Sequence, residues 1–141
     1  MENGVTVTTA TQQARTSPPL AGREIMLVED NHLVAGALKR YFESNGYGAA
    51  VFSTGRSAIA HVESARPAAA IVDLHLPDLS GLILIQQLRQ RLGPNTPIVV
   101  LSGDVSMATI NSLPHVGATY FFSKPVQPAA LLERLEQLLA A

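Results

Sequence analysis

The sequence predicts an α/β fold, with five helices around one doubly wound, five-stranded parallel sheet. Three observations predict it. From Arg23 onwards, short apolar runs of strand length alternate with segments whose apolar side chains recur at helical spacing. The apolar runs are continuous, which is typical of strands covered on both faces. The links between them are short, as expected for strands and helices that alternate along the chain.

The five expected strands are the apolar runs. We expect them at 25–28, 49–52, 69–72, 98–101 and 118–122. A carboxylate has no favourable place inside a strand that is buried on both faces. We therefore expect Asp73, which follows the third run, to lie at the exit of that strand, where backbone groups and water can reach it.

Five helices are expected between and after these strands. Thr54 and Ser80 are suitable N-caps, and Asn45-Gly46 is a suitable end for the first helix. The fourth helix, around 105–113, is rich in Thr, Asn and Ser, and Pro114 is expected at its end. In the last helix one face carries leucines, namely Leu131, Leu132, Leu135, Leu138 and Leu139.

Length and composition fit one domain that works with protein partners. The chain has 141 residues and a net charge of −1, so direct binding of nucleic acid or an anionic membrane is not expected. It contains no cysteine, which excludes disulfides and thiolate metal sites and fits a reducing, cytoplasmic location. No apolar run approaches the roughly 20 residues that would cross a bilayer. Hydrophobic residues make up 47% and charged residues 15%, which favours an apolar face for a partner or for self-association.

Residues 1–22 differ in composition from the rest of the chain. Thr, Gln, Ser and Pro are frequent and large apolar residues are few, which predicts a disordered N-terminal tail. The basic start and apolar block of a secretory signal are missing, although a transit peptide is an alternative. The folded domain is expected at residues 23–141.

Polar side chains collect where the predicted strands end. Glu29 and Asp30 follow the first strand, Asp73 the third, Ser102 the fourth, and Lys124, one of only two lysines, the fifth. In doubly wound sheets, ligands bind outside the carboxyl ends of the strands. Chance would scatter such groups over helix surfaces, so this clustering favours a functional site.

The residue types at these strand ends indicate phosphoryl chemistry assisted by a metal ion. Two carboxylates about 4 Å apart repel by about 4 kcal/mol at an effective dielectric constant near 20, so Glu29, Asp30 and Asp73 together call for a cation or for raised pKa values. Oxygen ligands suit Mg²⁺ or Mn²⁺. A carboxylate beside such an ion can attack phosphorus and form an aspartyl phosphate. A lysine and a hydroxyl opposite would hold the phosphoryl oxygens.

Four segments carry a resemblance to a known family. LVED, IVDLHLPDLSG, VVLSGD and ATYFFSKP occur in the order and at the separation found in receiver domains of two-component response regulators. From about Glu24 to Leu139 the chain resembles these domains, in particular the single-domain type related to the chemotaxis regulator. The resemblance implies a flavodoxin-like fold with strand order 2-1-3-4-5.

The resemblance also implies roles for the residues at the strand ends. Asp73 is expected to be the phosphoacceptor, taking phosphate from the phosphohistidine of a sensor histidine kinase or a phosphotransfer protein. Asp30, with Glu29 directly or through water, is expected to bind Mg²⁺ together with Asp73 and the backbone carbonyl of His75. Mn²⁺ is a possible substitute. Two further groups, the Ser102 hydroxyl and the Lys124 ammonium, are expected to contact the phosphoryl group.

The fifth strand and the loops beside it carry further expectations. Phe121 is expected to be the aromatic switch that changes rotamer as Ser102 moves, although any of the three adjoining aromatic residues, Tyr120, Phe121 and Phe122, could be core. The Lys124–Pro125 peptide bond is expected to be cis. His75 and Asp104 flank the route of the attacking water and are expected to tune the phosphoryl lifetime.

The chain departs from the family pattern at three points. Its first acidic pair is Glu-Asp, whereas Asp-Asp is commonest. Phe121 lacks the hydroxyl that Tyr, the alternative residue of the family, would supply. Pro114 falls in the region that normally transmits the signal, so the output surface is expected to be unusual.

Several structural alternatives compete with these roles. Asp30 could cap the first helix, Ser102 could cap the fourth, and Lys124 could be a surface lysine with its stem on apolar neighbours. At the level of function, a pseudo-receiver would be an interaction module with an unused pocket. A Mg²⁺-dependent phosphatase that works through a phospho-aspartate would need an acid/base residue two positions after the nucleophile, where this chain has His75.

The expected function is that of a switch, which is not an enzyme beyond its own phosphorylation and dephosphorylation. The signal is expected to pass to a downstream protein effector or to an output domain that this sequence does not contain. A homodimer through the fourth helix, fifth strand and fifth helix is a further expectation. Neither direct contact with nucleic acid nor with a membrane is expected.

Overall fold

The five predicted strands and five predicted helices are all present. The computed structural model describes residues 23–104 and 106–140, so the predicted disordered tail at 1–22 lies outside the described residues. The elements are β1 (Glu24–Val28), α1 (His32–Ser44), β2 (Gly48–Phe52), α2 (Gly55–Val62), β3 (Ala69–Asp73), α3 (Gly81–Leu92), β4 (Ile98–Ser102), α4 (Met107–Val116), β5 (Tyr120–Ser123) and α5 (Pro128–Ala140).

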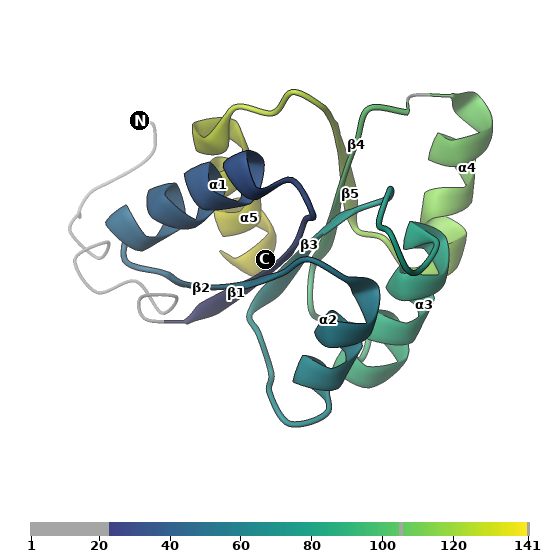
Figure 1. Ribbon diagram of the computed structural model, residues 1–141, viewed down its shortest axis with the longest axis horizontal. Helices are drawn as coiled ribbons and strands as arrows, with labels where there is room; N and C mark the ends of the chain where they lie inside the picture. The colour runs from purple at the N-terminus through teal and green to yellow at the C-terminus, as the bar shows by residue number, and fades with distance from the viewer. Residues whose placement is uncertain (1–22, 105, 141) are drawn as a thin grey trace.

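The sheet is parallel, and its strand order is β2-β1-β3-β4-β5, as predicted for a flavodoxin-like fold. Helices α1 and α5 lie on one face, and α2, α3 and α4 lie on the other (Figure 1). Alternate side chains of each strand therefore enter two separate cores. Ile25, Leu27, Ile71 and Leu101 pack on the α1/α5 side, whereas their neighbours pack on the α2/α3/α4 side.

Helix α4 continues past the position where the sequence analysis ended it. Pro114 lies inside the helix, which runs to Val116. A proline removes one backbone donor, but Pro114 lies near the helix end, and a turn closes the helix shortly after it. Gly117 has a φ of +102°, its N–H bonds to the Pro114 carbonyl, and the Ala118 N–H bonds to the Leu113 carbonyl. These two hydrogen bonds form a Schellman motif.

The strand register determines which side chains share a face at the carboxyl edge. Val28 is paired with Val72, so the next residues, Glu29 and Asp73, lie side by side. Strand β5 begins two residues later and ends one residue later than its predicted bounds of 118–122. Among the described residues, no helix is long and apolar enough to span a bilayer.

Candidate metal centre

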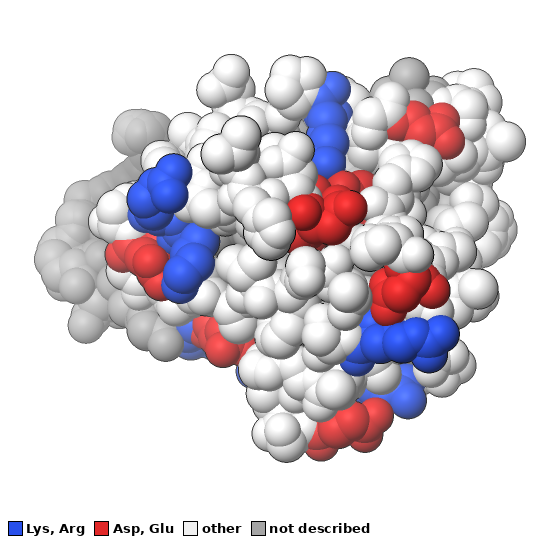
Figure 2. All heavy atoms as spheres, in the orientation of Figure 1, with Lys and Arg blue, Asp and Glu red and all other residues white. Residues whose placement is uncertain are grey.

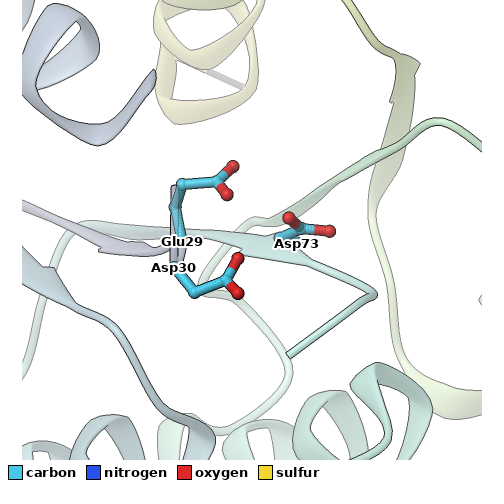
Figure 3. A group of neighbouring side chains, drawn as sticks. All are labelled: Glu29, Asp30 and Asp73. Atoms are coloured by element: carbon cyan, nitrogen blue, oxygen red, sulfur yellow. The ribbon is translucent and has the colours of Figure 1, made fainter. Parts of the chain in front are cut away.

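Three carboxylates meet at the carboxyl edge of the sheet. One ligand oxygen from each of Glu29, Asp30 and Asp73 lies within 4.8 Å of the others (Figure 3). Glu29 and Asp73 are buried, with 1% and 4% of their surface exposed, whereas Asp30 is exposed. The sequence predicts all three as metal ligands, and the fold brings them together.

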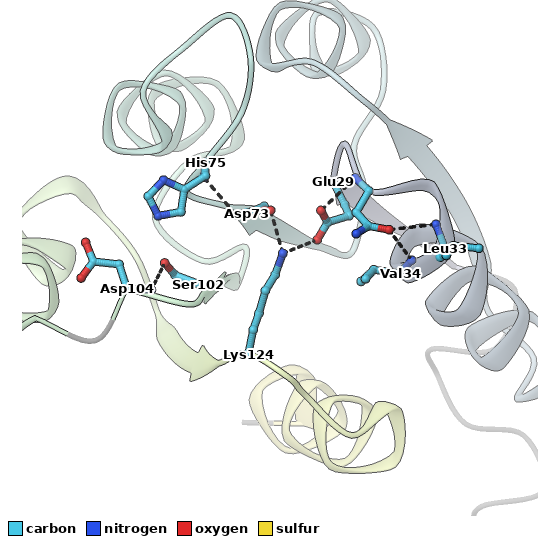
Figure 4. A network of polar contacts seen from close by, with 9 residues as sticks. Glu29, Leu33, Val34, Asp73, His75, Ser102, Asp104 and Lys124 are labelled. Carbon is cyan, nitrogen blue, oxygen red and sulfur yellow. Dashed lines mark hydrogen bonds and ion pairs between the residues drawn. The ribbon is translucent and has the colours of Figure 1, made fainter.

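Lys124 balances part of this negative charge. Its Nζ lies 2.8 Å from Asp73 Oδ2 and 3.0 Å from Glu29 Oε1 (Figure 4). The side chain comes from the loop after β5, and the Lys124–Pro125 peptide bond is cis, as predicted. Because the ammonium contacts two buried carboxylates, the alternative of a surface lysine without specific partners is wrong.

The charges of this cluster shift two pKa values. Burial raises the pKa of the Glu29 carboxyl, and the Asp73 carboxylate beside it adds to this rise, although the Lys124 ammonium and the Asn31 amide oppose it. Desolvation lowers the pKa of the Lys124 ammonium, but its contacts with Asp73 and Glu29 outweigh this effect, so the pKa is raised. Lys124 is therefore charged at neutral pH, and Glu29 is held in a site that disfavours its charge.

The donor set fits a hard divalent cation. Glu29 Oε1 is buried and has no hydrogen-bond partner among the described residues, since its 3.0 Å contact with Lys124 is an ion pair without hydrogen-bond geometry. Glu29 Oε2 accepts the Asn31 N–H at 3.1 Å. A buried carboxylate oxygen without a donor, next to two further carboxylates, is the arrangement that Mg²⁺ satisfies with oxygen ligands and water.

A cleft opens beside the acidic cluster. It has a volume of about 670 Å³, and its lining includes Asp30, His75 and Asp104. The exposed His75 donates its backbone N–H to Asp73 Oδ1 at 2.9 Å. Both oxygens of Asp73 are thus oriented, one by this amide and the other by Lys124. The cleft gives a small donor or the side chain of a partner access to the cluster.

Ser102 and Asp104 form a second polar group at the end of β4. The Ser102 side chain is fully buried, and its Oγ accepts the Asp104 N–H at 3.0 Å. Hydrogen bonds from the Ser106 amide and the Thr109 hydroxyl lower the pKa of the Asp104 carboxyl. Since Ser106 is the N-cap of α4, the alternative that Ser102 caps this helix is wrong.

Phe121 faces the α2/α3/α4 side of the sheet. It pairs with Val100, packs against the same core as Leu113, and lines a groove of about 390 Å³ between α4 and β5. Its neighbours Tyr120 and Phe122 contact each other at a tilt of 59°, with ring centroids 5.1 Å apart. Tyr120 also lines the groove and Phe122 packs with the α1/α5 core, so among these three described residues Phe121 is the one that packs in the core beside α4.

The N-cap of α1 is Asn31, a residue that the sequence-based prediction does not name. Asn31 Oδ1 accepts hydrogen bonds from the N–H groups of Leu33 and Val34, at 3.0 and 3.2 Å. The suggestion that Asp30 caps α1 is therefore wrong, and the Asp30 carboxylate remains free for the cluster. Asn is as good an N-cap as Asp, so the sequence did contain a signal for this cap in the residue next to Asp30.

Two further polar contacts join segments that are distant in the sequence, one beside the cleft and one at the opposite edge of the sheet. The Asp78 carboxylate accepts the N–H groups of Gly55 and Arg56 at the start of α2. Arg89 Nη2 donates to the Gly117 carbonyl at 2.7 Å, tying the end of α3 to the turn before β5. In each of these contacts the donor and the acceptor are more than 20 residues apart in the sequence, so no local pattern predicts them.

Charged groups are unevenly distributed over the face that holds the site. Acidic side chains gather at its middle, below a basic side chain, while the surface over α4 is almost free of charge (Figure 2). The molecule is thus a doubly wound α/β protein whose acids, hydroxyl and lysine meet at the carboxyl edge of the sheet, the edge at which such folds bind ligands.

The comparisons with known proteins identify the family. Residues 25–136 match the response regulator receiver domain, and the chain belongs to this family. It is 36% identical over 103 residues to the photosynthetic apparatus regulatory protein RegA of Rhodobacter capsulatus, a match that covers 73% of this chain and 55% of RegA. The chain thus spans about half the length of that relative. This membership does not favour the phosphatase or pseudo-receiver alternatives.

Solved structures agree with the fold. A CheY-like receiver domain protein from Methanospirillum hungatei JF-1 has a TM-score of 0.80 at 26% identity, covering 85% of this chain and 95% of that one. The receiver domain of the sensor histidine kinase PA1611 from Pseudomonas aeruginosa PAO1 has a TM-score of 0.77 at 27% identity, covering 86% and 100%. That structure holds a magnesium ion in its active-site cleft.

Proposed function

We propose that this chain is a phosphorylation-operated switch whose phosphoacceptor is Asp73. The observation that carries the proposal is the geometry around this carboxylate. Asp73 is held between a lysine ammonium at 2.8 Å and two further carboxylates, beside an open cleft. Within a receiver domain, this set supports acceptance of a phosphoryl group from a histidine kinase or a phosphotransfer protein.

In the proposed reaction, a carboxylate oxygen of Asp73 attacks the phosphorus of a phosphohistidine. The new P–O bond forms as the P–N bond breaks, and the imidazole leaves with its electron pair. Glu29, Asp30, Asp73 and the His75 backbone carbonyl would hold Mg²⁺, which supplies positive charge for the phosphoryl oxygens. Mn²⁺ would satisfy the same oxygen ligands.

Lys124 and Ser102 would hold the phosphoryl group after transfer. Lys124 is already within hydrogen-bonding distance of Asp73, and the Ser102 hydroxyl accepts from the Asp104 N–H, so its own proton remains available to a phosphoryl oxygen. Ser102 and Phe121 lie on the same face of the sheet, since Val100 pairs with Phe121. Movement of Ser102 would therefore reach Phe121 and the groove beside α4.

We assign the tuning of the phosphoryl lifetime to His75 and Asp104. Both line the cleft from which water would approach Asp73. The Asp104 carboxylate is fixed by Ser106 and Thr109, so its position on that route is well defined.

An apolar groove supports a protein as the phosphate donor. It has a volume of about 440 Å³ between α1 and the β5–α5 loop, and it is lined by Val34, Ala37, Leu38, Lys124, Pro125, Val126 and Pro128. Leu33 beside it is 84% exposed. A donor that covers these apolar side chains would lie directly next to Lys124 and the cleft.

The output would pass through protein contacts of α4, β5 and α5, either to a separate effector, to an output domain or within a homodimer. No Asp, Glu, Lys or Arg occurs between Met107 and Ser123, which supports an apolar contact there. We place the domain at residues 23–141. The expectations of a cytoplasmic location and of no direct contact with nucleic acid or membrane remain predictions.

The test is incubation with acetyl phosphate and Mg²⁺, followed by intact mass. We expect one added phosphate that is released by hydroxylamine and does not form without the metal ion. Asp73→Asn should take up none, whereas Asp104→Asn, which leaves the acceptor intact, should still take up one. Unchanged labelling of Asp73→Asn would show that another residue is the acceptor.

A further inference from the structure

The loop between β3 and α3, residues 74–80, forms one wall of the cleft. All seven of its residues line the cleft: His75 and also Leu74, Leu76, Pro77, Asp78, Leu79 and Ser80. Within the loop, His75 and Ser80 form an isolated antiparallel bridge, and the Gly81 N–H donates to the Leu74 carbonyl at 3.1 Å. The position of this wall therefore determines where the His75 amide meets Asp73.

Hydrogen bonds to Asp78 join this wall of the cleft to α2, a helix that contributes none of the proposed metal ligands. Its Oδ1 accepts the Gly55 N–H at 2.8 Å, and its Oδ2 accepts the Arg56 N–H at 2.9 Å. Arg56 Nε lies 3.7 Å from Oδ2. The first amides of a helix have no partner within the helix, and an anion there is favoured by the helix dipole. Both oxygens of one carboxylate thus bind the start of α2.

The electrostatics and the packing agree with this arrangement. Hydrogen bonds from the Gly55 and Arg56 amides lower the pKa of the Asp78 carboxyl, so it is ionised at neutral pH. The neighbouring Leu79 packs on Gly55, where an added Cβ would lie 2.8 Å from Leu79 Cδ1. At the other end of the loop, a Cβ on Gly81 would lie 2.4 Å from Leu74 Cα. The loop is held at both ends by close contacts.

We propose that Asp78 is a positioning residue for the metal and phosphoryl site. By fixing the loop to α2, it sets the His75 backbone, whose N–H donates to Asp73 Oδ1 and whose carbonyl is a proposed ligand of the divalent cation. This inference rests on the proposed function, because it concerns the affinity of that same site for Mg²⁺. Without the Asp78 carboxylate, the wall shifts and the cation loses a well-placed ligand.

The experiment measures the rate of phosphorylation by acetyl phosphate across a range of Mg²⁺ concentrations. For Asp78→Ala we expect the Mg²⁺ concentration at half-maximal rate to rise about tenfold, the effect typical of residues that orient a metal ligand. The rate at saturating Mg²⁺ should stay within about twofold of the wild type. The Asp78→Asn side chain keeps one acceptor for two amides. Its Mg²⁺ concentration at half-maximal rate should therefore lie between those of the wild type and Asp78→Ala.

Glu63→Gln is the matched control. It removes another carboxylate at α2, whose Oε2 lies 2.7 Å from Arg91 Nε, at the opposite end of this helix from Asp78. We expect a wild-type dependence on Mg²⁺. The inference is overturned if the Mg²⁺ concentration at half-maximal rate is unchanged in both Asp78 variants. It is also overturned if the rate is lowered by the same factor at every Mg²⁺ concentration.

Two further observations keep the outcomes separate. If the wild type takes up no phosphate, the proposed function fails, whatever the variants do. If Asp78→Ala does not fold, Asp78→Asn carries the test, together with the amide resonance of His75. We expect this resonance to shift in Asp78→Asn and to stay unchanged in Glu63→Gln, and an unmoved His75 amide contradicts a positioning role.

Discussion

The cleft edge and the α4–β5 region of this receiver domain are held together in opposite ways. At the cleft edge, the buried carboxylates of Glu29 and Asp73 lie within 3.0 Å of the partly exposed Lys124 ammonium. No Asp, Glu, Lys or Arg occurs from Met107 to Ser123, and apolar packing along a groove joins α4 to β5. In the proposed switch, the charges at one end would respond to a new dianion, while the apolar contacts at the other would shift at small cost.

The largest effect is expected where the two regions meet. Lys124→Ala should retain some phosphate on Asp73 but lose the response of α4 and β5, because no ammonium remains to follow the phosphoryl group. It should also lower the free energy of unfolding by about 1–2 kcal/mol without Mg²⁺, since two carboxylates are left facing each other at a site that water partly screens. Intact mass, NMR shifts of residues 107–123 and urea unfolding measure these three effects.

Lys39→Ala is the control, because it removes the only other lysine, which pairs with Glu43 on the exposed surface of α1. It should respond to phosphorylation like the wild type. If residues 107–123 shift normally in phosphorylated Lys124→Ala, the role given to this lysine is wrong.

A second effect concerns the charge of Glu29. Glu29→Gln keeps the shape but removes a proposed ligand, so we expect Mg²⁺ to bind about tenfold more weakly, as measured by calorimetry. Glu43→Gln, an exposed acid on α1, should bind Mg²⁺ like the wild type. Equal affinities in Glu29→Gln and the wild type would remove Glu29 from the ligand set.

Glu29→Gln should also change how the stability of the protein depends on pH when Mg²⁺ is absent. Because the pKa of Glu29 is raised in the folded state, its contribution to stability is complete below the ordinary carboxyl pKa of about 4.3 and is lost as the pH rises through the folded value. The wild type should therefore lose stability over this range, and Glu29→Gln should lack that loss in urea unfolding. The raised pKa of Lys124 acts only at alkaline pH, above about 10.

The smallest effect is expected on the apolar side. Phe121→Ala should take up phosphate normally but respond less, because the ring that contacts the α4 groove is gone. Its cost in stability should be about 1–2 kcal/mol, below that of a fully buried phenylalanine. Phe122→Ala, on the opposite face, should be destabilised similarly and keep its NMR response. A full response in Phe121→Ala would separate this ring from the switch.

The sequence was sufficient for the fold because the apolar runs and the caps agree with one another. It also placed Glu29, Asp73 and Lys124 near one edge, since the carboxyl ends of parallel strands meet there. The local details were harder. Asn31 and Asp30 are adjacent and equally good caps, so only the backbone geometry decides between them.

The misplaced end of α4 and the missed loop contacts have different physical reasons. Helix α4 ends in a local turn at Gly117, whereas Asp78 and Arg89 bind backbone groups of distant segments. The contacts of Asp78 and Arg89 depend on how separate elements approach each other. No periodicity or spacing within one segment encodes that approach.

The most direct test of the account is a crystal structure with Mg²⁺ and beryllofluoride, which mimics a phosphoryl group. We expect beryllium bonded to a carboxylate oxygen of Asp73, Mg²⁺ held by the acidic cluster, and Lys124 Nζ moved from Asp73 to a fluorine. An adduct on another side chain, or a Mg²⁺ ion bound away from Asp30 and Asp73, would contradict it.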